Sequence, residues 1–247
     1  MKIIAVYSIK GGVGKTATAV NLAYLASQEG AKTLLCDLDP QGAASFYFRI
    51  KPHQKYNAKK LLKGGTHLED GIRATDYAGL DVLPADFSYR NIDIALDEQK
   101  KSSRRLAKVL QPLSKEYDFI VLDCPPNLTL LSENIFNAAD IILVPMVPTT
   151  LSLLALKQLY AFLDDLGRGR EKVRIFFSMA ERRKKMHQQM MQAMQNKLGV
   201  LSTVIPHSAD IERMGLHRQP VAVAQPASMA TAAYKALWSE LSSGELP

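Results

Sequence analysis

The stretch KIIAVYSIKGGVGKTATAVNLAYLASQ, residues 2–28, decides the fold of this chain. Residues 3–7 form a short apolar run, residues 8–14 are rich in glycine, and Lys15 and Thr16 open an apolar segment with helical spacing. This order predicts a buried strand, a glycine turn and a helix. Glycines let backbone N–H groups approach phosphate oxygens, and the N-terminus of a helix adds positive potential. The stretch therefore predicts a phosphate-binding loop at the start of an α/β domain.

Short apolar runs recur along the rest of the chain, and most are too continuous for half-exposed strands. They alternate with segments of helical periodicity, which predicts a doubly wound, mainly parallel sheet of about seven strands with helices on both faces. We expect a single domain over residues 1–247, with loop and short helix on the surface at residues 49–76. The predicted strands are residues 3–7, 33–38, 80–83, 118–122, 140–147, 173–177 and 200–205, and the predicted helices include residues 15–29, 103–115, 150–165 and 185–197.

The composition is that of a soluble globular protein, with 47% hydrophobic and 22% charged residues. No apolar run approaches the roughly 18 residues that a membrane-spanning helix needs. The net charge of +7 favours a polyanionic partner, which could be nucleic acid, ATP or an acidic lipid surface. Cys36 and Cys124 lack the spacing of a metal or redox site, so we expect reduced, buried thiols in a cytoplasmic protein.

The glycine loop departs from the ordinary phosphate-loop pattern. That pattern has a glycine five residues before Gly14, but Ile9 stands there, with a second lysine, Lys10, beside it. The sequence KGGVGKT instead resembles the deviant phosphate loop of the ParA and MinD superfamily. Lys15 supplies a fixed charge for phosphate and Thr16 a hydroxyl for Mg²⁺, and the resemblance implies that Lys10 reaches the phosphates of the partner subunit in a nucleotide-sandwich dimer. Contacts to ATP are expected from Lys10, Gly11, Gly12, Val13, Gly14, Lys15, Thr16 and Ala17, although the family commonly has a second threonine in place of Ala17.

Two further apolar runs end in carboxylates. The run TLLCDLDPQG carries Asp37 and Asp39, whose spacing of two residues on a strand points both side chains to the same side. The run DFIVLDCPP puts Asp123 at the end of an apolar strand, where phosphate-loop ATPases have their magnesium-site acid. Ligands of parallel sheets gather beyond the carboxyl ends of the strands, so we expect all three acids beside the phosphate loop. Taken alone, an Asp pair at a strand end is more often a solvent-exposed or capping pair.

These runs also resemble the two switch motifs of the ParA and MinD superfamily. The resemblance implies that Asp39 orients the attacking water, while Asp37 supports the Mg²⁺ site through its hydration shell and Asp123 is the second acid of that site. Near the end of the chain, VIPHSADIERMG resembles the family segment whose proline packs on adenine. Pro206 and His207 are therefore candidate contacts of the base, with a surface turn as the alternative interpretation.

The resemblance implies a slow, partner-stimulated ATPase that works as a dimerisation switch. Water is the expected phosphate acceptor, since no acceptor-binding motif is readable. The expected partners are a second copy in the ATP state, non-specific DNA, and a ParB-like or other cargo adaptor, with the protein cytoplasmic and associated with the nucleoid when ATP is bound. No helix-turn-helix precedes the first strand, as in short members of the family. The candidate DNA contacts are Arg182, Arg183, Lys184, Lys185, Arg213 and Arg218. For the cluster at residues 182–185, a solvated helix face is an equal alternative.

Three other functions stay open from the sequence. A MinD-like positioning ATPase would bind membrane through a basic amphipathic helix at the C-terminus, but residues 235–247 contain one lysine, and Glu240 with residues 244–247 weakens both the charge and the helix. We therefore expect no membrane partner. A metabolic phosphate-loop enzyme could hold its acceptor within residues 49–76 and 85–100. A pure interaction protein would keep the nucleotide site without turning nucleotide over.

Overall fold

A computed structural model describes residues 1–54, 56–99 and 102–243. Its strands form one eight-stranded sheet in the order β3-β4-β2-β5-β1-β6-β7-β8, and every adjacent pair is parallel except β3 with β4. The mainly parallel α/β sheet is confirmed, but the predicted number of strands is one short, because β3 has only two residues. The strands are β1 (Lys2–Val6), β2 (Thr33–Asp37), β3 (Arg73–Ala74), β4 (Leu80–Leu83), β5 (Phe119–Asp123), β6 (Ile141–Met146), β7 (Val173–Ala180) and β8 (Val200–Pro206).

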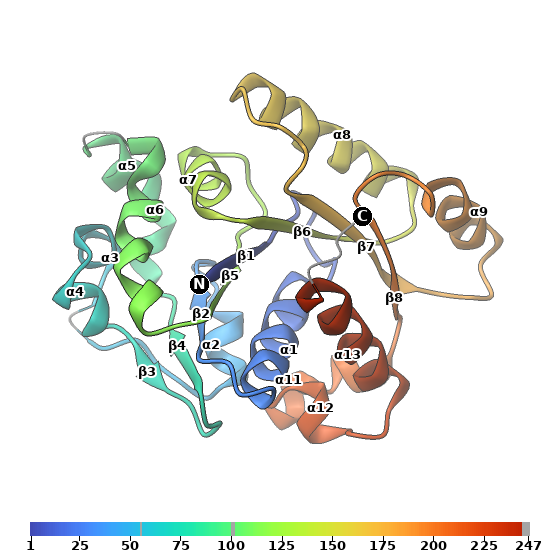
Figure 1. The fold of residues 1–247 in the computed structure, drawn as a ribbon, viewed down its shortest axis with the longest axis horizontal. Helices are drawn as coiled ribbons and strands as arrows, with labels where there is room; N and C mark the ends of the chain where they lie inside the picture. Colours follow the sequence, from blue (N-terminus) through green and yellow to red (C-terminus); the bar gives the residue numbers. More distant parts are fainter. Residues whose placement is uncertain (55, 100–101, 244–247) are drawn as a thin grey trace.

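Helices cover both faces of the sheet, as Figure 1 shows for α7 and α8 on one face and for α1 and α13 on the other. The α-helices are α1 (Lys15–Gln28), α2 (Ala43–Tyr47), α3 (Ala58–Lys63), α4 (Thr66–Glu69), α5 (Ile92–Asp97), α6 (Arg105–Leu110), α7 (Leu130–Ala138), α8 (Thr150–Asp165), α9 (Lys185–Met194), α10 (Ala209–Glu212), α11 (Met214–His217), α12 (Val221–Ala224) and α13 (Met229–Ser242). Three 3₁₀ turns are η1 (Phe87–Asn91), η2 (Ser102–Arg104) and η3 (Gln111–Lys115).

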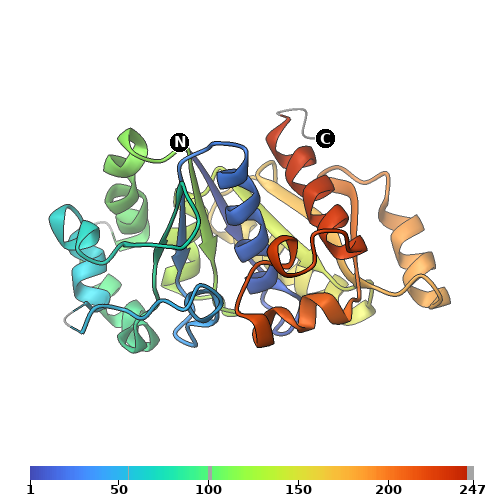
Figure 2. The ribbon, with the colours of Figure 1, turned by 90° about the horizontal axis from the view of Figure 1, so that it is seen from below.

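The apolar runs are continuous because each central strand packs on both faces. In β2, Leu34 and Cys36 join the core cluster on one side of the sheet, and Leu35 joins the cluster on the other. Figure 2, seen from below, shows α1 and α13 side by side along one of these faces. Cys36 and Cys124 are both buried with free thiols, as predicted.

The predicted helix over residues 103–115 is interrupted. It consists of η2, α6 and η3, and α6 ends at Leu110, just before the segment that holds Pro112 near its start. Proline has no N–H to donate to the preceding turn, and its ring crowds that turn, so a regular α-helix does not continue through it.

The expectation that residues 49–76 lie on the surface is wrong for their apolar side chains. The segment forms the predicted short helices, α3 and α4, but Leu61, Leu62 and Leu68 are buried in the core cluster, together with Tyr56. Helices of six and four residues are too short to show an apolar period in the sequence.

We expected Glu240 and residues 244–247 to weaken both the charge and the helix of the C-terminal stretch. Glu240 does not end the helix, since α13 continues to Ser242, and residues 244–247 lie outside the described part of the chain. The apolar side chains of α13, which include Tyr234 and Trp238, are buried against the sheet. The Glu240 carboxylate accepts hydrogen bonds from the backbone N–H groups of Ser202 and Thr203 in β8. The apolar face of α13 is therefore occupied by the core, and none of the described helices has the length and apolar character for crossing a membrane.

Candidate nucleotide and magnesium site

The phosphate loop joins the end of β1 to the start of α1, as predicted. Gly14 precedes α1 with a φ of 89°, and Gly12 has a φ of 69°, values that only glycine adopts readily. A Cβ on Gly14 would lie 3.1 Å from the Ser178 hydroxyl, whereas a Cβ on Gly11 or Gly12 would meet nothing within 4 Å. The loop thus packs tightly against β7 on one side and is open on the other, where a phosphate could approach the backbone.

Lys15 is fixed at this loop. Its side chain is 8% exposed, and its ammonium donates a hydrogen bond of 3.3 Å to the carbonyl oxygen of Lys10. Burial lowers the pKa of Lys15, while the negative charges of Asp123 and Asp39 raise it. The ammonium therefore stands over the loop beside the two acids, where it can bind phosphate.

Lys10 points away from its own loop. Its ammonium donates to the hydroxyl groups of Thr149, at 3.4 Å, and Ser152, at 3.3 Å, at the start of α8. The two lysines of the loop therefore occupy different places, Lys15 over the loop and Lys10 against α8.

Asp37 and Asp123 occupy matching positions on the neighbouring strands β2 and β5, and both are fully buried. Burial raises the pKa of Asp37 to about 6, although two hydrogen bonds from Ser45 oppose this shift. The pKa of Asp123 is also raised, first by burial and then by the charge of Asp37, while Thr16 and Lys15 favour its ionised form. Two buried carboxyl groups in adjacent positions place negative charge in the site, which an additional cation would stabilise.

The buried carboxylate oxygens fit a magnesium ion. The Thr16 hydroxyl lies near Asp123 and the N–H of Asp39 lies near Asp37, and both favour the ionised carboxylates. Among the described residues, however, none has good hydrogen-bond geometry to Oδ1 of Asp37 or to either carboxylate oxygen of Asp123. Unsatisfied buried oxygens are costly, and carboxylate, hydroxyl and water oxygens are the ligands that Mg²⁺ prefers. Within the described residues, no group of three or more His, Cys, Asp or Glu could hold a metal by itself. The remaining ligands would come from Thr16, phosphate and water, as is usual for this ion.

Asp39 lies in the turn that follows β2 and is only half-buried. One of its carboxylate oxygens accepts a hydrogen bond of 3.0 Å from the N–H of Gln41, and its backbone carbonyl accepts one from Gly42. This turn leaves Asp39 accessible to water, unlike Asp37 and Asp123. The three predicted acids therefore do come together, at the carboxyl end of the sheet.

Pro206 and His207 lie at the end of β8, where the N–H of His207 donates to the carbonyl oxygen of Ala180 at the end of β7. Met179, just before, has a φ of 52°, and the pairing of β7 with β8 shifts register there. Pro206 and His207 border a groove of about 830 Å³ that runs between β8 and α13. Their contact with the adenine base stays a prediction.

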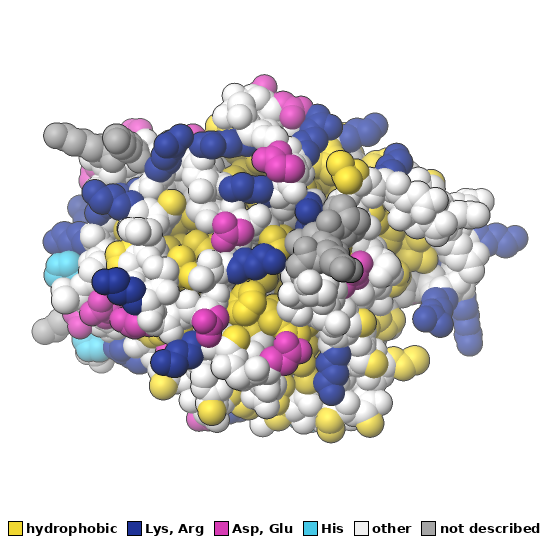
Figure 3. Space-filling view, in the orientation of Figure 1, with side chains coloured by type: hydrophobic (Ala, Val, Ile, Leu, Met, Phe, Trp, Pro, Cys, Tyr) yellow, Lys and Arg dark blue, Asp and Glu magenta, His cyan; other side chains and the backbone are white. Residues whose placement is uncertain are grey.

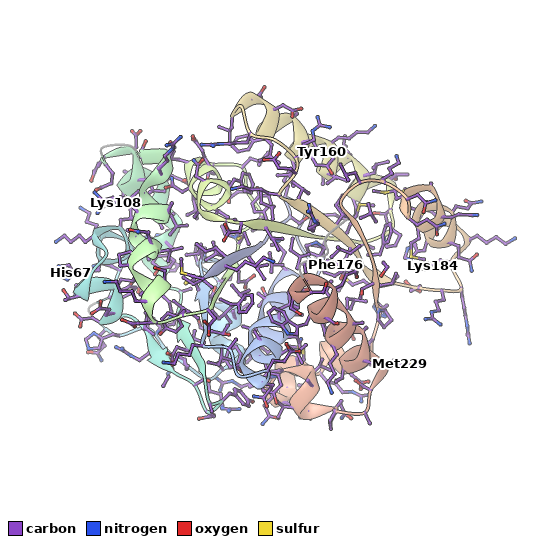
Figure 4. All side chains as sticks on the ribbon, in the orientation of Figure 1. His67, Lys108, Tyr160, Phe176, Lys184 and Met229 are labelled. Atoms are coloured by element: carbon purple, nitrogen blue, oxygen red, sulfur yellow. The ribbon has the colours of Figure 1, made fainter. Side chains whose placement is uncertain are left out.

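The six predicted DNA contacts lie in different surroundings. Arg182 and Arg183 are exposed in the loop between β7 and α9, near Lys184, which pairs with Glu181. Figure 4 places Lys184 at the edge of the molecule, and Figure 3 shows basic side chains projecting around α9. Lys185 is exposed at the start of α9, and Arg213 pairs with Asp210 at 3.6 Å. Arg218 instead stacks over the ring of Phe46, with 4.4 Å between its guanidinium carbon and the ring centre.

Several residues around the site were not found by sequence reasoning. Thr149 and Ser152 hold Lys10, Ser45 binds Asp37, and Asn21 joins α1 to the C-terminal segment by accepting from the N–H of Val221. Small polar residues in or beside helices often bond to the nearby backbone, so their sequence offers no distinct signal. Only the position of Ser45, soon after the DLDPQG turn, could have drawn attention to it.

The chain is similar to known proteins in both sequence and fold. Residues 1–175 match a protein family model described as an AAA domain. The chain is similar to the chromosome partitioning protein ParA of Myxococcus xanthus, with 30% identity over 253 residues that cover 100% of this chain and 89% of that protein.

Two solved structures have the same fold. A plasmid partition protein of Borrelia burgdorferi bound to AMPPNP superimposes with a TM-score of 0.83 at 24% identity, covering 96% of both chains. A cobyrinic acid a,c-diamide synthase of Mycobacterium smegmatis, with an ATP analogue and magnesium, gives a TM-score of 0.81 at 22% identity over 100% of this chain and 98% of that one. Since these two proteins differ in activity, the fold alone does not decide function. The similarity in sequence extends along the whole chain, however, and the chain belongs to the ParA/MinD family of phosphate-loop partition ATPases.

Proposed function

We propose that this protein is an ATP-hydrolysing dimerisation switch that binds DNA without sequence preference in its ATP state and positions a plasmid, a chromosome or large protein cargo. The observation that carries the switch is the separation of the two loop lysines. Lys15 serves its own phosphate loop, whereas Lys10 lies against α8 and is available for phosphates outside that loop. A lysine held by two neutral hydroxyl groups gains from exchanging them for phosphate oxygens.

The residues of the chain then have separate roles in hydrolysis. Backbone N–H groups of the loop and Lys15 bind the phosphates, while Thr16, Asp37 and Asp123 would hold Mg²⁺, which would neutralise charge on the phosphate oxygens. Asp39, half-buried and accessible to water, orients the attacking water molecule. Pro206 and His207 contact the base. Hydrolysis removes the phosphate that Lys10 contacts in the partner subunit, so the dimer separates.

The DNA role rests on the exposed basic side chains around α9. Arg182 and Arg183 project from a loop, and pairing of two subunits would double their number on one assembly. Binding through phosphates falls steeply with salt because counterions are released. In the proposed cycle the protein is cytoplasmic, and it lies on the nucleoid while ATP holds the dimer together. A ParB-like or other cargo adaptor would stimulate hydrolysis.

The test is binding of the purified protein to non-specific duplex DNA and to anionic liposomes, each with ATP, with ADP and without nucleotide at fixed salt. We expect the protein to bind DNA in the sample with ATP and not in the samples with ADP or without nucleotide. Binding to liposomes only would favour the MinD-like function, and binding to neither would refute the DNA role.

Charge reversal of both Arg182 and Arg183 to Glu should weaken DNA binding and reduce its salt slope by about 1 for each phosphate that the protein no longer neutralises. The matched control also reverses two charges, Lys63→Glu with Lys108→Glu, since both lysines are exposed, on α3 and α6, and Lys108 lies far from Lys184 in Figure 4. Equal effects of the two changes would mean that DNA responds to net charge only.

One observation favours a second candidate, a metabolic enzyme with a small acceptor. A hollow of about 360 Å³ lies in the two segments where we expected an acceptor site, between α3 and α5. Asn57, Ser88, Asn91 and Glu98 are among the polar residues that line it. Filling it by Ala95→Phe should leave ATP hydrolysis and DNA binding unchanged in a partition switch. Loss of hydrolysis in a folded variant would favour the enzyme.

A further inference from the structure

Ser45 contacts the magnesium-site acid Asp37 twice. Ser45 lies in the short helix α2, eight residues after Asp37, and is 4% exposed. Its hydroxyl donates a hydrogen bond of 2.7 Å to Oδ2 of Asp37, and its backbone N–H donates one of 2.8 Å to the same oxygen. Two donors on one carboxylate oxygen restrict the rotation of that carboxyl group, because rotation would break both bonds.

A third residue fixes the direction of these bonds. The backbone N–H of Ala85, just beyond β4, donates a hydrogen bond of 3.0 Å to the Ser45 hydroxyl oxygen. An amide N–H can only donate and an ionised carboxylate can only accept, whereas a hydroxyl does both. The hydroxyl hydrogen of Ser45 is therefore directed to Asp37, and the chain of bonds runs from Ala85 through Ser45 to Asp37.

The effect on Asp37 is asymmetric. Oδ2 receives both bonds from Ser45, while no described residue satisfies Oδ1, which is buried. Asp123, the register partner of Asp37 on β5, also has two buried oxygens; Thr16 lies near them, but no described residue has good hydrogen-bond geometry to either. In metal sites, a residue outside the ligand set often holds one oxygen of a carboxylate and leaves the other free for the ion. Ser45 does this to Asp37.

We propose that Ser45 is a positioning residue for the magnesium site, and that it presents Oδ1 of Asp37 to the hydrated ion. This inference rests on the proposed Mg²⁺-nucleotide function of the site. It adds a route by which the loop after β4 can affect that site, because Ala85 belongs to that loop and orients the Ser45 hydroxyl.

A simpler structural role would be that Asp37 caps α2. Gly42 precedes α2 without any side-chain cap, and the N–H of Ser45 is one of the amides that a helix start leaves unpaired. The two roles predict different results. Loss of a cap would weaken the fold whether or not Mg²⁺ is present. Loss of positioning would change the Mg²⁺ requirement and would not change the affinity for nucleotide in the absence of Mg²⁺.

The experiment titrates Mg²⁺ into the full-length protein with a fluorescent ATP analogue, without DNA, and repeats the binding in EDTA. Ser45→Ala should raise the Mg²⁺ concentration for half-maximal binding by about 10-fold, the lower end of the cost of removing an outer partner of a direct metal ligand, because Asp37 acts on the ion through water. Its affinity in EDTA should stay within about twofold of the unaltered protein. Ser45→Thr, which keeps the hydroxyl, should restore the Mg²⁺ requirement.

The control is Ser27→Ala, since Ser27 is also a buried serine and its hydroxyl donates only to the carbonyl oxygen of Tyr24. Melting curves report whether each variant is folded. If Ser45→Ala does not fold, Ser45→Cys provides the test, because a thiol of similar size is a weak donor. An unchanged Mg²⁺ requirement in a folded variant, or an equal loss of affinity with and without Mg²⁺, would overturn the proposal.

Failure of the proposed function gives a different result. If the unaltered protein does not bind DNA but Ser45→Ala still shifts the Mg²⁺ requirement, only the DNA role is wrong. If the unaltered protein binds nucleotide equally well with and without Mg²⁺, both proposals are wrong.

Discussion

The ammonium of Lys10 donates a hydrogen bond of 3.3 Å to the hydroxyl of Ser152, in the first turn of α8. A cation at the N-terminus of a helix faces the positive end of the helix dipole, so the interaction of the Lys10 ammonium with α8 is electrostatically unfavourable. Thr149 is the second acceptor of the ammonium and also caps α8, by accepting from the N–H of Ser152. The contact therefore holds Lys10 within its own subunit only weakly.

Removing one acceptor should favour the dimer. We expect Ser152→Ala to raise the ATP-dependent dimerisation constant about 5- to 30-fold, since each of the two subunits loses one long hydrogen bond that contributes on the order of 0.5–1 kcal/mol. Affinity for ADP in the monomer should not change. Sedimentation at several protein concentrations measures the constant, and Lys10→Ala should abolish the dimer with or without the Ser152 change. A weaker dimer in Ser152→Ala would show that Lys10 needs α8 in its active position.

Asp39→Ala should separate ATP binding from ATP hydrolysis. The carboxylate lies in a turn near the phosphate loop and is not needed to hold the loop itself, so we expect ATP to remain bound and the dimer to persist. Hydrolysis should fall by about 100-fold or more, the usual contribution of a residue that positions or activates water. Single-turnover hydrolysis measures this loss. Lys15→Ala is the contrasting variant, which should not bind nucleotide, and normal turnover in Asp39→Ala would refute the role of Asp39.

Stability without Mg²⁺ should depend on pH through the buried acids. The pKa of Asp37 is about 6 in the folded protein, above that of an ordinary Asp, so the folded state binds the proton more tightly than the unfolded chain. The free energy of unfolding therefore falls as pH rises between about 4 and 6 and stays lower above that range. Asp37→Asn should raise the melting temperature in EDTA more at about pH 7.5 than at about pH 5. An equal effect at both pH values would contradict the raised pKa.

Asn21→Ala should destabilise the fold without affecting the chemistry. The buried amide of Asn21 donates to the carbonyl oxygen of Ala17 and accepts from the N–H of Val221. Its removal leaves a buried N–H unpaired, which costs about 1–3 kcal/mol in the free energy of unfolding. Urea denaturation measures this cost, and Ser27→Ala on the same helix is the milder control. No measurable loss would mean that water replaces the amide.

Arg218 should act through packing more than through DNA. Its guanidinium stacks on Phe46 and donates to the carbonyl oxygen of that residue, while its own carbonyl accepts from Arg49. Arg218→Ala should cost about 0.5–1 kcal/mol in stability, typical of an exposed cation–π contact. The salt slope of DNA binding should change less than it does on reversing Arg182 and Arg183. A larger change in slope would place Arg218 among the phosphate contacts.

The fold and the centre of the site could be predicted from the sequence because each follows from local pattern. The glycines, Lys15 and the carboxylates at strand ends belong to strand-turn-helix units in which spacing determines position. Ser152 could not be found in this way, because its partner Lys10 comes from a distant segment of the chain. Ser45 lies close to the DLDPQG turn, but its contact with Ala85 also joins distant segments.

The errors in the prediction have the same origin. Residues 49–76 bury leucines in helices of one or two turns, and β3 pairs over two residues, so neither gives a periodic signal. The buried face of α13 depends on packing against the sheet. From the sequence alone, acidic Glu240 is expected to be a solvent-exposed residue, and its contact with β8 cannot be predicted.

That contact has a consequence for self-association. Among the described strands, β8 is the last of the sheet and pairs only with β7, so its outer edge could accept a strand from another molecule. The Glu240 carboxylate already takes the N–H groups of Ser202 and Thr203, and a charged side chain at an exposed edge discourages such addition. The chain is thereby protected against edge-to-edge aggregation.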